Sequence, residues 1–167
     1  MTKSILSFFL ILTTLCGQTQ TSTFKSSKYG YSIDKPSDFG QAPATGVHID
    51  YKVVNKDGSS ISVLVSKRLL EEQGIDAWSY SKEYFEKVFS YQEPVSVISK
   101  TEKITINGKK TFLIYYSYPS NRGTNLKVIE AYLFVGDNAY VITTTSDEQY
   151  YDVHKTVFFK TIKSIKF

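Results

Sequence analysis

Residues 101–145 carry the strongest fold signal in the sequence, four apolar runs separated by turn residues. Asn107-Gly108 stands between the first two runs and favours a tight hairpin, because both turn positions need a positive φ. Residues 136–138 separate the last two runs, and residues 120–124 form a looser connection. β-Branched and aromatic residues dominate the runs, as is typical of strands. The segment therefore predicts an antiparallel meander of one short strand followed by three long ones.

Side chains alternate between the two faces of a strand. In the second run, Phe112, Ile114 and Tyr116 point to one face, and Leu113 and Tyr115 point to the other. Both sets are apolar, whereas an antiparallel sheet with one face in water would alternate apolar with polar residues. We therefore expect the rest of the chain to cover both faces of this sheet.

Two segments with helical periodicity supply the covers. The first spans residues 75–91 and has Asp76 near its start, where an acidic cap is favourable. The second spans residues 146–160, with Ser146 as the expected N-cap and acidic residues in the first turn, which suit the helix dipole. The expected apolar stripes are Ile75, Trp78, Phe85, Val88 and Phe89 in the first helix, and Tyr150, Val153, Val157, Phe158 and Ile162 in the second.

The remaining strands precede the first helix. Residues 24–33 predict two short strands that meet at a turn near Gly30, and residues 47–54 and 60–65 predict a hairpin around the turn at 55–58. Ser60, Ser62 and Leu64 share one face of the last strand, which places this pair nearer an edge. The expected fold is an α+β, three-layer α/β/α sandwich around a central antiparallel sheet of about six or seven strands. Its C-terminal tail, residues 164–167, is expected to dock as an extended piece.

The N-terminus predicts an export signal. Lys3 precedes the apolar run 5–12, which is too short to span a bilayer. We expect a signal peptide at residues 1–18, a short polar linker at 19–22 and a single domain at 23–167. The mature protein would be periplasmic or secreted, with no transmembrane span.

Cys16 is the only cysteine and ends this leader. A lipoprotein signal places a small residue before the acylated cysteine, and Leu15 departs from that pattern. Ordinary cleavage near Gly17 or Gln18 and lipidation of Cys16, which would tether the protein to a membrane, are the two alternatives. Either way, the mature domain would have no disulfide and no cysteine chemistry.

The sequence predicts little reactive chemistry. It has no Gly-x-Ser-x-Gly elbow and no glycine-rich phosphate loop. His48 and Asp50 are expected on one face of a strand and could bind a metal or transfer a proton, but an exposed strand pair is the simpler interpretation. His154 is interpreted as a packing or surface residue. Asp147, Glu148 and Asp152 could line a cation site, although helix capping explains them more simply. We expect no enzyme activity, no cofactor and no resident metal.

Charge and aromatic content point to a protein partner. The net charge of +4 is mild and the lysines are dispersed, so neither nucleic acid nor a polybasic lipid contact is expected. Tyrosine is abundant, at 13 residues. Trp78, Tyr115 and Tyr118 are candidate binding residues, because tyrosine and tryptophan are favoured at interfaces. The alternative is that they lie at the margins of the core.

Two segments resemble the PsbP-like fold family. The opening hairpin, Tyr29 to Pro36 (YGYSIDKP), is similar to the first hairpin of that family, and Phe159 to Phe167 (FKTIKSIKF) is similar to its closing tail. The resemblance covers residues 23–167 in layout and implies fold alone, because none of the family's functional residues matches here. We expect an exported, non-enzymatic binding or accessory module that contacts a protein partner through a sheet edge or an aromatic helix–sheet groove. The alternative is a small-molecule or lipid carrier with an apolar cavity between helix and sheet, as in a cystatin-like cone.

Overall fold

The computed structural model describes residues 22–69 and 73–167. The leader at 1–18, most of the linker and Cys16 lie outside them. In chain order the elements are β1 (Ser22–Lys25), β2 (Ser32–Lys35), β3 (Gly40–Gln41), β4 (Ile49–Val54), β5 (Ser60–Lys67), η2 (Ala77–Ser79), α1 (Lys82–Phe89), β6 (Val97–Ile106), β7 (Lys109–Pro119), β8 (Asn125–Val135), β9 (Asn138–Asp147) and α2 (Glu148–Ser164). This is the expected α+β class.

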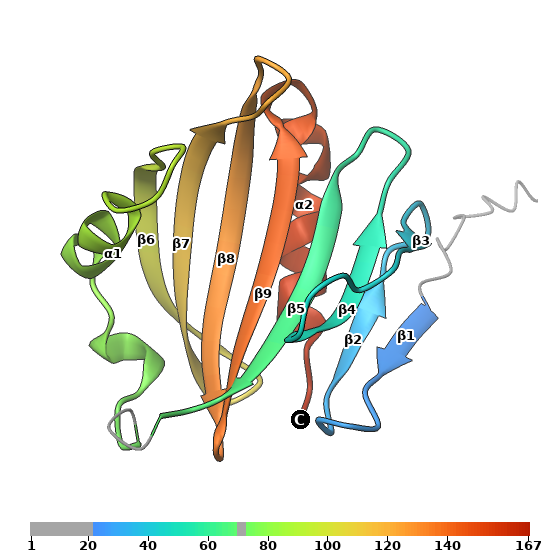
Figure 1. Ribbon diagram of the computed structural model, residues 1–167. Helices are drawn as coiled ribbons and strands as arrows, with labels where there is room; N and C mark the ends of the chain where they lie inside the picture. Colours follow the sequence, from blue (N-terminus) through green and yellow to red (C-terminus); the bar gives the residue numbers. More distant parts are fainter. Residues whose placement is uncertain (1–21, 70–72) are drawn as a thin grey trace, which may run out of the picture.

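An antiparallel sheet of seven strands dominates the described residues (Figure 1). Its order is β3-β4-β5-β9-β8-β7-β6, and β1 and β2 form a separate pair. The predicted turn at Asn107-Gly108 joins β6 to β7, and both of its residues have positive φ, 46° and 78°. The sheet of six or seven strands and the meander are therefore confirmed.

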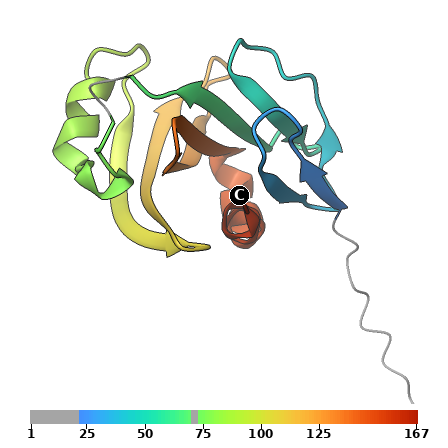
Figure 2. The same ribbon diagram turned by 90° about the horizontal axis from the view of Figure 1, so that it is seen from below.

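The sheet curves around α2, which lies against its concave side (Figure 2). Phe158 and Ile162 of α2 are fully buried there with Ile142 of β9 and Leu133 of β8. Fully burying one such side chain contributes about 1.5–3 kcal/mol, so this interface stabilises the fold. The C-terminal tail docks as expected, because Lys166 pairs with Ser32 of β2 through two backbone hydrogen bonds.

Helical segments cover only part of the opposite face of the sheet. α1 and η2 pack over β6, β7 and β8, where Phe85 and Phe89 meet Phe112 and Ile114. Over β9 and β5 the same face bears half-buried polar side chains such as Thr143. The Ser60 and Ser62 pattern therefore marks the uncovered half of the face, although β5 itself lies inside the sheet between β4 and β9.

The single helix expected at 75–91 is wrong, because the chain breaks it at Tyr80 and Ser81. Ser81 has an extended backbone and its hydroxyl accepts a hydrogen bond from the N–H of Tyr84, which starts α1. The ring of Tyr80 packs instead against five aromatic rings of the helix and sheet. A serine favours a cap over a helix interior, and the aromatic contacts of Tyr80 hold the break in place.

The strand expected to be short, near residues 104–106, is the ten-residue β6. β6 is an edge strand, and its lysines and glutamate are the residue types that protect exposed edges from pairing. Because of these charged residues, the first part of β6 lacks the apolar pattern from which a strand is predicted.

The last helix begins two residues later than expected, with Asp147 rather than Ser146 as its N-cap. Its buried residues also differ, since Tyr150 and Val153 are 37% and 71% exposed. The buried side consists of Tyr151, His154, Phe158, Thr161 and Ile162. Phe158 and Ile162 are buried as expected, whereas the N-terminal part of the predicted stripe is wrong, because the polar His154 takes a buried place that a search for apolar periodicity does not assign to it.

Candidate binding groove

A groove of about 380 Å³ lies between α2 and the neighbouring strands of the meander. It is open to solvent on one side. Its volume is within the range of about 300–1,000 Å³ that is usual for ligand sites. We call it the tyrosine–lysine groove and define it by Lys100, Glu102, Tyr115, Lys127, Tyr151, Lys155 and Phe159.

The helix side of the groove is a stripe along α2. Tyr151, Lys155 and Phe159 are spaced four residues apart, and this spacing puts them on one side of a helix. The ring of Phe159 meets that of Tyr115 from β7, with the centroids 5.9 Å apart. Aromatic rings from the helix and the sheet thus form the floor.

A β-bulge at Ser99 places Lys100 in this groove. Ile98 pairs with Tyr116 and Lys100 pairs with Tyr115, so Ser99 is an extra residue in β6. Without the bulge, Ile98 and Lys100 would share a face, since alternate residues of a strand do so. The bulge turns Lys100 toward Tyr115, while Ile98 stays buried under α1. A bulge at this place re-aims one charged side chain into the groove.

Lysine ammonium groups lie over the aromatic rings of the groove. Such cation–π contacts contribute about 0.5–1 kcal/mol each at exposed sites. The distances from Nζ to the ring centroid are 5.5 Å for Lys100 over Tyr115, 5.5 Å for Lys127 over Tyr151, 5.9 Å for Lys155 over Tyr151 and 5.9 Å for the adjacent Lys163 over Phe159.

Two of these lysines have carboxylate partners. Lys100 lies 2.5 Å from Glu102, and Lys127 lies 2.9 Å from Glu148. The hydrogen bond from Lys100 lowers the pKa of Glu102, and the one from Lys127 lowers the pKa of Glu148. Among the described residues, Lys155 forms no ion pair. The groove therefore keeps an uncompensated positive charge.

The hydroxyl of Tyr115 is buried at the groove and has no hydrogen-bond partner of suitable geometry within residues 22–69 and 73–167. The Tyr115 side chain is only 7% exposed. Burial raises the pKa of this phenol, and the nearby Glu102 carboxylate raises it further. The hydroxyl therefore stays protonated in the folded protein.

The three candidate binding residues from the sequence lie apart. Tyr115 faces the groove, whereas Tyr118 lies on the other face of β7 and stacks on Tyr116. Trp78 is in η2, where its indole N–H donates to the carbonyl of Ile104 and Lys110 lies over its ring. The structure brings none of these three into contact with another.

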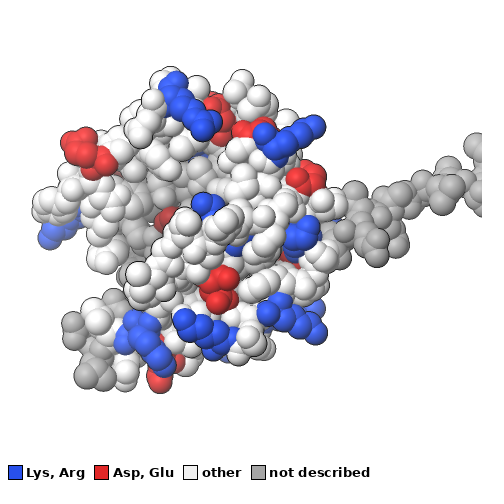
Figure 3. Space-filling view, turned by 45° about the vertical axis from the view of Figure 1, so that its right-hand side comes forward, with Lys and Arg blue, Asp and Glu red and all other residues white. Residues whose placement is uncertain are grey.

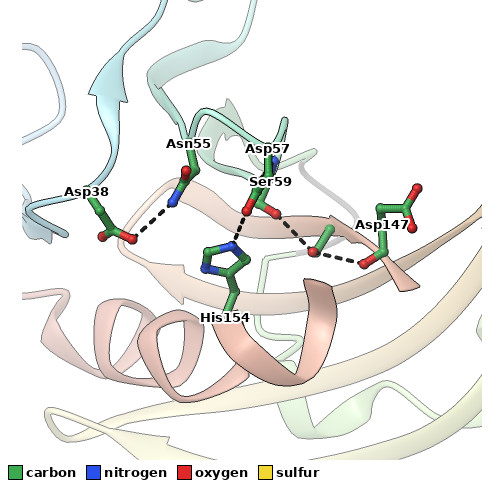
Figure 4. Close-up of polar contacts among 7 residues, drawn as sticks. Asp38, Asn55, Asp57, Ser59, Asp147 and His154 are labelled. Carbon is green, nitrogen blue, oxygen red and sulfur yellow. Dashed lines mark hydrogen bonds and ion pairs between the residues drawn. The ribbon is translucent and has the colours of Figure 1, made fainter. Parts of the chain in front are cut away.

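The histidines occupy different environments. His48 is exposed in the turn before β4, and a bulge between Ile49 and Tyr51 interrupts the alternation expected to align it with Asp50. His154 of α2 is buried, and its Nε2 lies 2.6 Å from Oδ2 of Asp57 (Figure 4). Its ring also packs against those of Phe39 and Phe158.

Other polar side chains near His154 are held by their own contacts (Figure 4). The hydroxyl of Ser59 bonds that of Ser146, and the amide of Asn55 donates to Asp38. Asp147 is the N-cap of α2, which agrees with the interpretation of this residue as a helix cap. Within the described part of the chain, no group of three or more histidine or acidic side chains could hold a metal ion.

Sequence analysis missed the lysines and Tyr151 of the groove. The signal for the helix side was present, since Tyr151, Lys155 and Phe159 follow a four-residue spacing. Lys100 carried no such signal, because its direction depends on the bulge at Ser99.

No protein-family model and no curated protein matches the sequence. Solved structures are similar in fold. The solution structure of cyanobacterial PsbP (CyanoP) from Synechocystis has a TM-score of 0.66 at 14% identity, over 90% of this chain and 94% of that chain. LpqN, involved in cell envelope biogenesis of Mycobacterium tuberculosis, has 0.59 at 13% identity, over 88% and 90%. A putative regulator of unknown function from Pseudomonas aeruginosa has 0.53 at 14% identity, over 86% and 94%. At these identities the similarity concerns the fold, and the expected PsbP-like fold is confirmed.

Proposed function

We propose that this chain, which has the PsbP-like fold, is an exported, non-enzymatic binding or accessory module that contacts a protein partner through the tyrosine–lysine groove. One observation carries the proposal: an aromatic floor and Lys155, which forms no ion pair within the described residues, lie together in one open groove. Tyrosine combines apolar contact area with a polar tip and is favoured where one surface must hold another.

A protein partner fits the charge pattern better than nucleic acid does. On the face seen in Figure 3, basic and acidic side chains are interspersed. At the groove, two of the lysines are already neutralised by Glu102 and Glu148. A nucleic-acid surface would need clustered basic residues along a path of phosphates.

The packing around α2 favours surface binding over the carrier alternative. Phe158, Ile162 and Ile165 are fully buried between the helix and the strands, so side chains fill the place where a carried ligand would lie. A non-enzymatic role is supported by the fact that His154, Ser59 and Asp57 bond to neighbouring side chains and hold elements together.

Export rests on the leader at residues 1–18, which is outside the described residues. In the described part of the chain, no helix combines the length and apolar character needed to cross a bilayer. Similar folds include a protein that takes part in envelope biogenesis, which is compatible with a place in the envelope. Fractionation of cells that express the full chain, with an antibody against a C-terminal tag, tests the export.

Site-specific photo-cross-linking tests the partner contact. A photoreactive residue replaces Ser117, which lines the groove and takes no part in its ion pairs, and in a matched strain it replaces Val153, which is 71% exposed on α2. We expect position 117, and not position 153, to cross-link one protein repeatedly in living cells. Equal labelling from both positions, or none from position 117, would contradict the proposal.

A further inference from the structure

We infer that the occupant of the tyrosine–lysine groove is an extended acidic segment of the partner protein, in which carboxylates alternate with apolar side chains. This inference rests on the proposed function and adds the chemistry of the partner.

Charge complementarity selects an acidic segment. Three lysines line the groove, and two of them, Lys100 and Lys127, are paired with Glu102 and Glu148. Lys155 forms no ion pair within the described residues, and its ammonium lies 5.9 Å from the centre of the Tyr151 ring. A carboxylate of the partner would meet Lys155 beside an aromatic face, where part of the water is already excluded and an ion pair is stronger than at an open surface.

The aromatic floor adds a second requirement. The rings of Tyr115, Tyr151 and Phe159 line the groove, and those of Tyr115 and Phe159 lie with their centroids 5.9 Å apart. Aromatic rings offer a large apolar contact area. An apolar side chain of the bound segment would pack against these rings.

The extended conformation follows from the strand that borders the groove. β6 is the last strand in the sheet order, so its outer edge has no strand partner in the described chain. Ser99, Lys100 and Glu102 of this strand line the groove. An extended segment beside β6 can use backbone hydrogen bonds for affinity and alternate side chains for specificity. A helix in the same place would leave the backbone groups of β6 unused.

Synthetic peptides test the inference. The probe is a capped peptide of about eight residues that alternates glutamate with leucine, the spacing of an extended strand. Two control peptides replace every glutamate with glutamine or with lysine. Binding is measured by calorimetry, and by amide chemical shifts of the protein. We expect the glutamine peptide to bind at least about tenfold more weakly than the acidic one, since it loses the charge pairing.

Two protein variants locate the binding. Lys155→Glu reverses a charge in the groove, and Lys160→Glu makes the same change at an exposed position of α2 that lines a different groove. We expect Lys155→Glu to weaken binding of the acidic peptide at least about tenfold. Lys160→Glu should change the affinity by less than about threefold, because screening limits the effect of distant surface charges. Far-UV circular dichroism and thermal unfolding verify that both variants fold.

The inference is overturned if the acidic peptide does not bind, if the glutamine peptide binds equally well, or if both variants weaken binding alike. Such results would leave the proposed function in place when position 117 still cross-links a partner in cells. Absence of that cross-link is the separate result that would remove the proposed function.

Discussion

The imidazole Nε2 of His154 lies 2.6 Å from Oδ2 of Asp57, and 97 residues of sequence separate the two. Their side chains are 6% and 17% exposed. Asp57 also accepts the backbone N–H of Ser59 through its other oxygen, at 2.8 Å. The contact therefore fastens the turn between β4 and β5 onto the buried side of α2.

The costs of removing the two partners of this pair should not be additive. We expect Asp57→Ala to lower the free energy of unfolding by about 1–3 kcal/mol, because it leaves the buried imidazole without its partner. The double variant with His154→Ala should be less destabilised than the sum of the single variants. Urea unfolding of all four proteins measures the coupling, and additive losses would show that the contact contributes nothing.

The free energy of unfolding should fall in acid partly because the carboxyl of Asp57 becomes protonated. Burial alone would raise the pKa of its carboxyl, but hydrogen bonds from His154 and Ser59 outweigh burial and lower that pKa below its usual value. The stabilisation is therefore present above the unfolded-state pKa of about 3.9 and is lost as pH falls through the folded-state value.

We expect Asp57→Asn to flatten the loss of stability below about pH 4, measured by urea unfolding at a series of pH values. Asp152→Asn, at an exposed position of the helix that carries His154, is the control and should leave the curve unchanged. If Asp57→Asn loses stability below about pH 4 as steeply as the original protein, other carboxyl groups cause that loss.

Local chemistry made part of this fold predictable. The turn at Asn107-Gly108 has the backbone that its two residues favour, so the meander followed from sequence. Alternation along β7 and β8 placed Leu113 and Ile129 on the α2 side without knowledge of α2. These features depend on neighbours in the chain.

Other features depend on contacts between distant residues. The break at Tyr80 is held by rings from β7 and β8 as well as α1. The bulge at Ser99 exists only as a register shift between two strands, so the direction of Lys100 could not be derived from its spacing. The buried side of α2 was predicted correctly at Phe158 and Ile162 and incorrectly near its start, where His154 is buried through its partner Asp57.

The core under α2 should be sensitive to truncation at Phe158. This ring is fully buried and contacts Phe39, with the centroids 6.3 Å apart. We expect Phe158→Ala to lower the free energy of unfolding by about 3–5 kcal/mol through lost burial and a residual cavity. Val153→Ala on the exposed side of the same helix should cost less than about 0.5 kcal/mol. Similar losses in both variants would contradict the observed orientation of α2.

Asn107 should stabilise the protein through its side chain as well as its backbone. Its amide donates to the carbonyls of Lys163 and Ile165, which ties the β6–β7 turn to the C-terminal tail. Asn107→Gly keeps the positive φ and loses these bonds, so we expect a cost of about 1–2 kcal/mol. Asn107→Ala should cost about 1 kcal/mol more, because alanine resists that backbone conformation. Equal stability of the two variants would show that φ is unimportant here.

The hydroxyl of Tyr115 should contribute nothing to the stability of the free protein. It is buried and unpartnered within the described residues, so Tyr115→Phe removes an uncompensated polar group. We expect the free energy of unfolding to stay within about 0.5 kcal/mol or to rise. Tyr140→Phe is the matched control, since that buried hydroxyl donates to the carbonyl of Tyr29 at 3.0 Å.

The control should cost about 1–2 kcal/mol, because it leaves the Tyr29 carbonyl without this donor. Thermal and urea unfolding, followed by circular dichroism, measure both variants. If Tyr115→Phe is as destabilising as Tyr140→Phe, the Tyr115 hydroxyl already has an acceptor in the folded chain, with Glu102 as the nearest carboxylate that acts on its pKa.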